Sequence, residues 1–149
     1  MSFLVKDAIE YQKLNLGITY LLISKNSGKL LSYTTFCMGA LKLPERMDEF
    51  VFKGKRLKDY PKDFPNQFPA LLIGKLATDK REVGKGGAGF LLDFAVKTAF
   101  EIRSRIGCAY MVAHAYTRPD IIKWYENKGF GSYLTDAKGR DTIPMYFEL

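Results

Sequence analysis

Apolar and polar positions near the N-terminus change from helical spacing to strand-like spacing. Within the first fourteen residues, three apolar side chains follow the i, i+3, i+4 pattern of one helix face, at Val5, Ala8 and Ile9. Residues 18–24 and 30–38 are rich in β-branched, aromatic and other apolar side chains, which favours strands. The Asn-Ser-Gly sequence at 26–28 is a turn signal between them. This part of the chain predicts a short amphipathic helix followed by an antiparallel hairpin.

The middle of the chain has the pattern of a strand, a long helix and a second strand. Residues 68–78 and 108–115 are strongly apolar, which is typical of strands in the centre of a sheet. Residues 84–106 between them carry apolar side chains at intervals of three and four, at Leu91, Ala95, Ala99, Ile102 and Ile106. This spacing predicts a helix with one buried stripe, ended by Gly107. The two strands should be parallel and joined by a right-handed crossover.

The remaining segments complete a mixed fold. Pro119 opens a helix that should end before Gly129. Residues 130–133 and 142–147 predict two closing strands around a Lys-Gly-Arg turn, and the charged, proline-containing segment 41–68 predicts an irregular connection with room for one helical turn. We therefore expect an α+β fold with a mixed, mostly antiparallel twisted sheet flanked by helices, built as a single domain over residues 1–149.

Composition and charge narrow the function classes without selecting one. With 47% hydrophobic and 26% charged residues, the chain of 149 residues can bury a core. No apolar run approaches the roughly 20 residues needed to cross a bilayer. The charged N-terminus differs from a signal peptide, so we expect a cytoplasmic protein. The net charge of +7 fits a phosphate-bearing cofactor or nucleic acid as partner, and it equally fits a basic surface that keeps the protein soluble.

Metal-binding and nucleophilic side chains are few. Cys37 and Cys108 form no CxxC pair and His114 is the only histidine, so the sequence predicts no metal and no disulfide framework. Both cysteines lie in apolar stretches and are expected to be reduced core residues rather than nucleophiles. His114 is expected on a strand that ends at the functional site. A lone histidine in an apolar strand is more often packed than catalytic, so no catalytic role is assigned to it.

A glycine-rich turn before the long helix is the strongest chemical signal. Residues 83–89 read Val-Gly-Lys-Gly-Gly-Ala-Gly. Glycines accept positive φ and let main-chain N–H groups approach a phosphate, while a helix N-terminus adds free donors and a positive dipole. The P-loop pattern is absent. The dinucleotide pattern GxGxxG fits Gly84, Gly86 and Gly89, but residues 108–116 lack the acidic residue that would bind the ribose. An acyl-CoA site and a purely structural turn remain as alternatives.

The segment LATDKREVGKGGAGFLLDFAV resembles the cofactor-binding segment of the GNAT superfamily of N-acetyltransferases. In that family, a strand and a charged bend precede the motif Q/R-x-x-G-x-G/A, which leads into a Leu-Leu helix. Aligned on Leu91 and Leu92, the motif falls on residues 83–88, with Val83 where the family prefers Gln or Arg. The resemblance implies a GNAT-like fold, with acetyl-CoA as co-substrate. The residues that it implies in acetyl-CoA binding are Ala77, Thr78, Val83, Gly84, Lys85, Gly86, Gly87, Ala88, Gly89 and Arg118.

The segment from Trp124 to Phe130 resembles a second GNAT signature, in which a tyrosine precedes Gly-Phe. The resemblance implies that the Tyr125 hydroxyl lies near the sulfur of acetyl-CoA and protonates the leaving thiolate. A phenol is protonated at neutral pH and can donate in this way. The alternative is a partly buried aromatic at the end of a helix. Arg118 stands where the family often has an Asn that contacts the cofactor, and it would either salt-bridge a phosphate or face solvent.

No general base stands out. Asp79 and Glu82 are candidates, acting directly or through water, and both are equally explained as solvated residues of the bend before the glycine turn.

Further segments read DAIEYQKLNLGITYLL, SYTTFCMGALKLP and FPALLIGKLATD, with VAHA at residues 112–115. These segments are similar to the GNAT toxins of toxin–antitoxin pairs and their stand-alone relatives. This similarity implies a primary amine as acceptor, such as an aminoacyl-tRNA, a protein or a small amine, and a homodimer is common in the family. A basic loop with interleaved aromatic residues fits either an RNA substrate or a solvated loop, and its cations are Lys53, Lys55, Arg56, Lys58 and Lys62. The alternative function is a basic RNA-binding or regulatory module that retains an acyl-CoA pocket without turnover.

Overall fold

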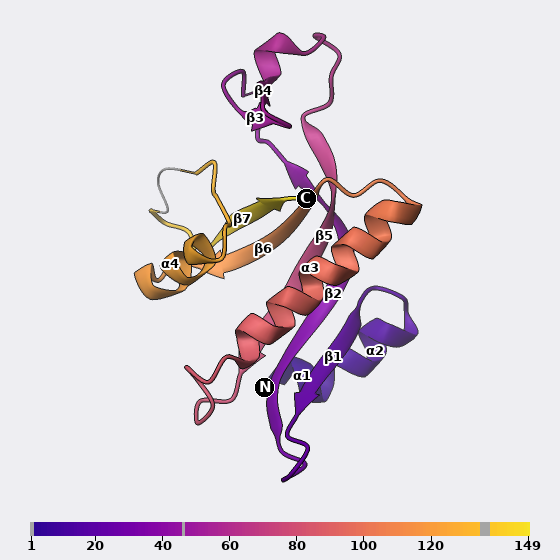
Figure 1. Ribbon diagram of the computed structural model, residues 1–149, viewed down its shortest axis with the longest axis vertical. Helices are drawn as coiled ribbons and strands as arrows, with labels where there is room; N and C mark the ends of the chain where they lie inside the picture. Colours follow the sequence, from indigo (N-terminus) through magenta and orange to yellow (C-terminus); the bar gives the residue numbers. More distant parts are fainter. Residues whose placement is uncertain (1, 46, 135–137) are drawn as a thin grey trace.

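A five-stranded mixed sheet forms the centre of the protein (Figure 1) in the computed structural model, which describes residues 2–45, 47–134 and 138–149. The strands lie in the order β1 (Ile18–Ile23), β2 (Leu30–Lys42), β5 (Gln67–Thr78), β6 (Tyr110–Tyr116) and β7 (Thr142–Glu148). β5 and β6 are parallel, and the other neighbours are antiparallel. The expected α+β fold with a mixed, mostly antiparallel sheet is confirmed.

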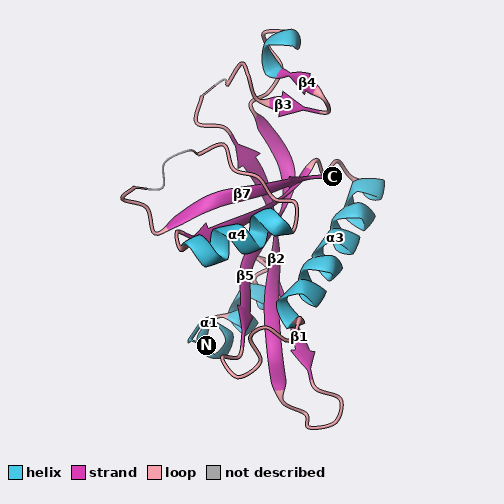
Figure 2. Ribbon diagram, turned by 60° about the vertical axis from the view of Figure 1, so that its left-hand side comes forward, coloured by secondary structure: helices cyan, strands magenta, loops and turns pink. Residues whose placement is uncertain are grey.

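One face of the sheet is covered by α3 (Gly87–Arg105) and α4 (Pro119–Asn127), which follow β5 and β6 respectively (Figures 1 and 2). Buried residues of α3 pack on inward-facing strand residues in one apolar cluster, which includes Leu92, Ala95, Ala99, Leu71 and Met111. The predicted helical stripe is therefore correct along most of its length. Its last member, Ile106, lies just beyond the helix and is exposed.

The opposite face is covered at its two ends by different segments. The short helices α1 (Ser2–Lys6) and α2 (Ala8–Lys13) lie beside β1 and β5, and Lys75 of β5 places its Nζ 5.4 Å from the ring centroid of Phe3. At the other end, the connection from β2 to β5 folds back with β3 (Val51–Phe52), β4 (Lys55–Arg56) and a 3₁₀ turn, η1 (Leu57–Asp59). Its aromatic residues form a second cluster with Phe68, Tyr110 and Tyr146.

Two predictions about single elements are wrong. The N-terminal helix is two short helices that meet at Asp7, and of the predicted face only Ala8 is buried, whereas Val5 and Ile9 are exposed. The strand predicted at 130–133 is reduced to one isolated bridge between Gly131 and Tyr146. Positions 135–137 of the predicted closing hairpin lie outside the described residues.

Candidate active site

The parallel strands β5 and β6 separate halfway along their length. Their pairing ends at Ile73 and Ala113. Beyond this point, β5 continues beside β2 to Thr78, and β6 continues beside β7 to Tyr116. The carboxyl ends of two parallel strands therefore flank a split in the sheet, and this is where ligands bind in many sheets with parallel strands.

A bulge at Gly74 accounts for the separation. Opposite β5, Phe36 is in register with Ile73 and Thr35 with Lys75, so Gly74 is an extra residue in the strand. A bulge bends the strand that contains it and increases its twist. Because the bulge follows the last residue that pairs with β6, β5 turns away from β6 at this residue and stays paired with β2.

The glycine-rich turn is joined to β5 by the bend at residues 79–82 and leads into α3. Gly84 and Gly86 have φ of 85° and 88°, which side chains with a Cβ rarely adopt. Gly86 is the N-cap of α3, and no side chain of the described residues caps this helix end. The first turn of α3 also contains no acidic residue. The N–H groups of the first helical residues therefore have no intrahelical acceptor, and they add to the positive end of the helix dipole.

Two glycines in the first turn of α3 are close to side chains of other elements. A Cβ on Gly87 would lie 2.5 Å from Oγ of Ser32, so only glycine lets the helix start pack this closely on β2. A Cβ on Gly89 would lie 3.4 Å from Nζ of Lys128. Lys128 is the C-cap residue of α4. Its ammonium therefore places the end of the Tyr125 helix beside the glycine-rich turn.

The other residues implied in acetyl-CoA binding lie around this turn. Ala77 and Thr78 are half-buried at the end of β5, beyond the last pair with β6, and Thr78 Oγ1 accepts a 3.0 Å hydrogen bond from Ser32 Oγ. Ala88 is half-buried in the first helical turn, and Val83 is exposed in the bend. Lys85 is exposed and forms a 3.1 Å ion pair with Glu82.

Tyr125 lies on the inner side of α4 and is buried, with 7% of its surface exposed. Its ring meets Trp124 and Phe130 edge-on, at centroid distances of 5.0 and 5.3 Å. Burial raises the pKa of Tyr125 to about 12, and no described residue forms a hydrogen bond with its hydroxyl. The hydroxyl is therefore a protonated donor at neutral pH, without a competing acceptor among the described residues.

Tyr125 and α3 share one apolar cluster, which contains Leu92 and Ala95. The structure thus brings the Tyr125 helix against the helix that follows the glycine-rich turn. It does not bring Arg118 to the same place by any described contact. Arg118 is the N-cap residue of α4, is exposed, and forms a 2.8 Å ion pair with Asp120 of its own helix.

The two candidate general bases are engaged in ion pairs within the bend. The Asp79 carboxylate accepts hydrogen bonds from the side chain and the main chain of Arg81, and these bonds lower the pKa of Asp79 to about 2. Glu82 pairs with Lys85. Asp79 is consequently a poor proton acceptor at neutral pH, which favours its interpretation as a bend residue.

The cysteines are free thiols. Burial raises the pKa of Cys108, and also that of the half-buried Cys37. Both thiols are therefore disfavoured as nucleophiles. No group of three or more His, Cys, Asp and Glu side chains suitable for a metal ion occurs within the described part of the chain.

The basic loop is largely neutralised by its own neighbours. Arg56 and Lys58 both pair with Glu49, at 3.3 and 2.7 Å, and Lys53 pairs with Glu148 at 3.6 Å. Lys55 lies 4.7 Å from the ring centroid of Tyr60. The interleaved aromatic rings pack inward on the second cluster. The structure thus favours the alternative of a folded, solvated loop over an open RNA-binding surface.

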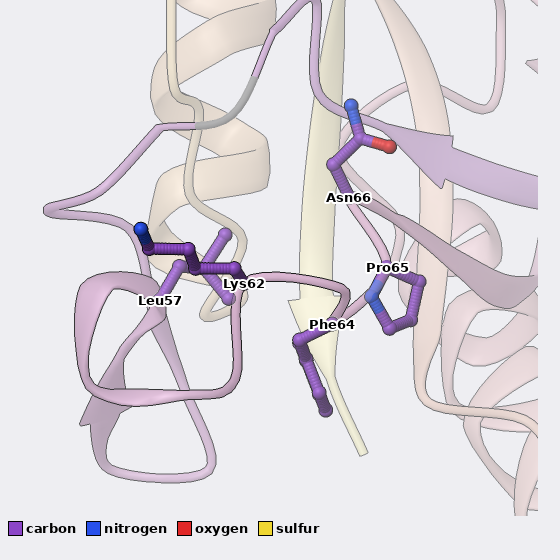
Figure 3. Close-up of a pocket in the computed structure, with 5 residues that line it drawn as sticks. All are labelled: Leu57, Lys62, Phe64, Pro65 and Asn66. Carbon is purple, nitrogen blue, oxygen red and sulfur yellow. The ribbon is translucent and has the colours of Figure 1, made fainter.

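Two hollows of the described surface lie away from the split. A cavity of about 220 Å³ lies in the β2–β5 connection, at the opposite end of β5, and its lining includes Leu57, Phe64 and Asn66 (Figure 3). A wider hollow of about 550 Å³ lies between α1, α2 and β1. Neither hollow contains Tyr125 or a residue of the glycine-rich turn, so the candidate site is defined by the strands and helices around the split.

Three features of the site were not predicted from the sequence. The bulge at Gly74 could have been suspected, because an isolated glycine within a strand pattern often marks one. Lys128 directly precedes the Gly-Phe pair of the second signature, but its approach to Gly89 has no signal in the sequence. His114 was expected to be packed and is exposed, because β6 has no strand beside it on the β5 side at this position.

No helix among the described residues is long and apolar enough to cross a membrane.

The fold is similar to that of bacterial toxins. No protein-family model matches the chain, and no curated protein matches it significantly in sequence. A bacterial toxin structure superimposes with a TM-score of 0.79 at 18% identity, covering 99% of this chain and 75% of that chain. A tyrosine-to-phenylalanine mutant of KacT gives a TM-score of 0.75 at 18% identity, covering 99% and 79% of the two chains. AtaT in complex with acetyl-methionyl-tRNAfMet gives 0.73 at 18% identity, covering 98% and 79%.

These similarities confirm the expected resemblance at the level of the fold. The neighbours AtaT and KacT are GNAT toxins of toxin–antitoxin systems, and this chain has their GNAT-like fold. Other similar structures are AtaTR bound with acetyl-CoA and AtaT bound to the C-terminus of the antitoxin AtaR.

Proposed function

We propose that residues 1–149 form one acyl-CoA-binding domain that transfers the acetyl group of acetyl-CoA directly to a primary amine. The observation that carries this proposal is the arrangement at the split. The uncapped N-terminus of α3 follows β5 on one side, and the Tyr125 helix follows β6 on the other. Similar folds that contain acetyl-CoA or acetyl-methionyl-tRNA support the same activity.

The diphosphate of acetyl-CoA fits the start of α3. Gly84 and Gly86 have positive φ, a conformation in which successive main-chain N–H groups can form an anion-binding concavity, and nothing lies within 4 Å of where a Cβ would be at either residue. The helix dipole and the Lys128 ammonium add positive charge at this point, without an acid in the first helical turn. The main-chain donors do not depend on the residue at Val83. The Gln or Arg that the family prefers there is therefore not essential to this binding.

The end of β5 suits the extended arm of acetyl-CoA. Beyond Ile73, alternate main-chain N–H and C=O groups of β5 point to the side that β6 has left. In our proposal, Ala77 and Thr78 hold the amide groups of the arm by main-chain hydrogen bonds, and Lys85 contacts a phosphate after releasing Glu82. Arg118 would join them only by leaving its ion pair with Asp120.

Tyr125 is proposed as the general acid. Acetyl-CoA supplies an acetyl group activated as a thioester. The neutral amine nitrogen forms a bond to the acetyl carbon and gives up one proton to solvent, the carbon–sulfur bond breaks, and its electron pair goes to sulfur. Tyr125 donates its hydroxyl proton to that sulfur and regains a proton from solvent. Its buried setting keeps the hydroxyl protonated until a stronger base forms beside it.

The proposed acceptor is a primary amine, with the α-amine of an aminoacyl-tRNA first among the classes to be tested. The complex of AtaT with acetyl-methionyl-tRNAfMet and the net charge of +7 support this choice. A homodimer and an antitoxin partner are proposed by the same analogy. The alternative of an RNA-binding module without turnover has less support, because the cations of the basic loop are largely paired.

Isothermal titration with acetyl-CoA, with NAD as the control ligand, tests the proposal directly. We expect acetyl-CoA to bind in the micromolar range and NAD not to bind. Release of free CoA is then followed with aminoacyl-tRNA, peptide and small-amine acceptors. Absence of acetyl-CoA binding would refute the proposal, whereas binding without turnover on any of these amines would support the regulatory alternative.

A further inference from the structure

The sheet face opposite α3 and α4 presents a separate group of side chains at the split. Side chains along a strand point alternately to the two faces of its sheet. In β6, Ala113 and Ala115 belong to the cluster under α3 and α4, so His114 and Tyr116 point to the opposite face. Both are exposed. His114 is the first residue of β6 beyond the last pair with β5, and so it stands at the inner end of the split.

On the same face, β5 forms the other edge of the split and carries Lys75, and the neighbouring strand β2 carries Tyr33. Lys75 follows the bulge at Gly74, and its ammonium points toward Phe3 of α1. Tyr33 of β2 is in register with Ala77. Burial, followed by electrostatic interaction with Tyr116, raises the pKa of Tyr33. Tyr33, beside β5, and Tyr116, at the end of β6, thus place phenols on the same face at the two sides of the split.

Few groups on this face can take up a proton near neutral pH. The titratable side chains around the split are Tyr33, Cys37, Lys75, His114 and Tyr116, while the adjacent part of β7 contributes Pro144 and Thr142. A lysine ammonium has no lone pair, and a phenol or a thiol with a raised pKa is already protonated. The imidazole of His114 is the remaining acceptor among these described groups.

Carboxylates are scarce among the strand residues of this face. Among the described strand residues that point to it, the single carboxylate is Glu148, which is in register with Tyr110 at the far end of β6 and pairs with Lys53. A site built for a polyamine or another polycation would need acidic side chains near the amine. The neutral and cationic groups at the split suit an amine attached to a neutral or anionic body.

We propose that His114 is the general base of the reaction, and that the acceptor amine enters from the face that carries His114, Tyr33 and Tyr116. This inference rests on the proposed acetyl transfer. His114 accepts one proton from the acceptor's ammonium and becomes imidazolium, and the neutral amine then attacks the thioester from this face. The attacking nitrogen gives up its second proton to solvent as the amide forms. Tyr125 protonates the leaving thiolate from the α3–α4 face, and His114 afterwards releases its proton to solvent. The acid and the base thus act from opposite faces of the sheet.

The kinetic test compares the wild type with His114→Gln, using puromycin as acceptor, a hydrolysis-stable aminoacyl nucleoside with a free α-amine. At pH 7, kcat/KM for puromycin should fall by about tenfold in the variant, because an α-amine with a pKa of about 7.7–8.0 is roughly one-tenth neutral at this pH. The deficit should shrink as pH rises, because an amine that is already deprotonated needs no base. Thr142→Val, on the same face of β7, is the control and should keep the wild-type profile. Spermidine should be a much poorer acceptor than puromycin for the wild type.

Nuclear magnetic resonance supplies a readout independent of turnover. Because His114 is the only histidine in the chain, its imidazole signals need no further assignment. In the presence of CoA, saturating puromycin should shift these signals and change their titration with pH.

The outcomes separate this inference from the proposed function. A wild type that does not bind acetyl-CoA refutes the acetyltransferase proposal itself. If acetyl-CoA binds, then either a His114→Gln variant with the wild-type rate at pH 7 or an imidazole signal that ignores puromycin overturns the role of His114. Equal loss of rate at every pH would also overturn it, because that result indicates a purely structural role.

Discussion

The ammonium of Lys128 lies against Gly89, where an added Cβ would be 3.4 Å from Nζ. The same ammonium lies 5.8 Å from the ring centroid of Trp124, which favours its position along the end of α4. A cation beside the positive end of a helix is unfavourable in itself. The position of the Lys128 ammonium beside the N-terminus of α3 is explained if both bind the same anion. The diphosphate of acetyl-CoA is the proposed anion.

Lys128→Ala should therefore weaken acetyl-CoA binding by about tenfold, the loss of one charge-assisted contact worth about 1.4 kcal/mol. Lys123→Ala, which removes an exposed lysine of the same helix, is the matched control and should bind normally. Isothermal titration at low and at high salt measures both variants. Equal affinities of the two variants would show that Lys128 does not contact the cofactor.

Gly84→Ala should reduce acetyl-CoA affinity through the conformation of the turn. The φ of 85° is unfavourable for alanine by about 1–2 kcal/mol, and the space around the position is open, so the change acts on the backbone and not through a steric clash. Gly54→Ala is the control, because Gly54 has φ of 74° and equally open surroundings but lies in the β2–β5 connection. Thermal denaturation should show similar destabilisation in both variants, and titration should show weaker binding for Gly84→Ala alone. Unchanged binding in Gly84→Ala would argue against the turn as the diphosphate site.

The order of the elements could be predicted from the sequence because hydrophobic periodicity is a local property. Residues 18–24, 68–78 and 84–106 each follow one period over several positions, and the structure confirms a strand, a strand and a helix there. The predictions failed where tertiary contacts decide. Residues 130–133 have the composition of a strand, but only Gly131 pairs with β7. The predicted N-terminal stripe buries a single residue, Ala8.

The candidate site could be predicted only as two separate segments. The glycine-rich turn and Tyr125 were recognised because their motifs are contiguous. The separation of β5 from β6 depends on one bulge, which the isolated Gly74 could have suggested, but its register is set by β2 and is not contained in a local pattern. The same separation leaves His114 exposed, in contrast to the packed histidine that an apolar strand predicts.

Gly87→Ala tests the close packing of α3 on β2. The new Cβ would lie 2.5 Å from Ser32 Oγ, so the start of the helix must shift, at a cost of about 1–3 kcal/mol in the free energy of unfolding. Ser32→Ala removes that oxygen and should recover part of the loss in the double variant, giving a measurable coupling energy. Urea denaturation of the four proteins of this cycle measures the coupling. Strict additivity would mean that the Ser32 contact is not what requires glycine at this position.

Tyr125→Phe separates the role of the hydroxyl in chemistry from its effect on the fold. Turnover should fall by about 100-fold, with little change in acetyl-CoA affinity, because the ring and its packing are retained.

The second effect of Tyr125→Phe concerns the stability of the protein at alkaline pH. Burial raises the pKa of Tyr125 from 10.0 to about 12, so the folded state holds this proton more strongly than the unfolded state does. The stabilisation that this proton gives the folded state is complete below the pKa of Tyr125 in the unfolded chain, and it is lost as pH rises through the pKa in the folded state. Between pH 9 and pH 11, the wild type should thus lose about 1–2 kcal/mol more stability than Tyr125→Phe, as measured by urea denaturation. If both proteins lose the same stability, the pKa of Tyr125 is not raised in the folded state. That result would contradict the proposal that burial keeps this hydroxyl protonated as a donor.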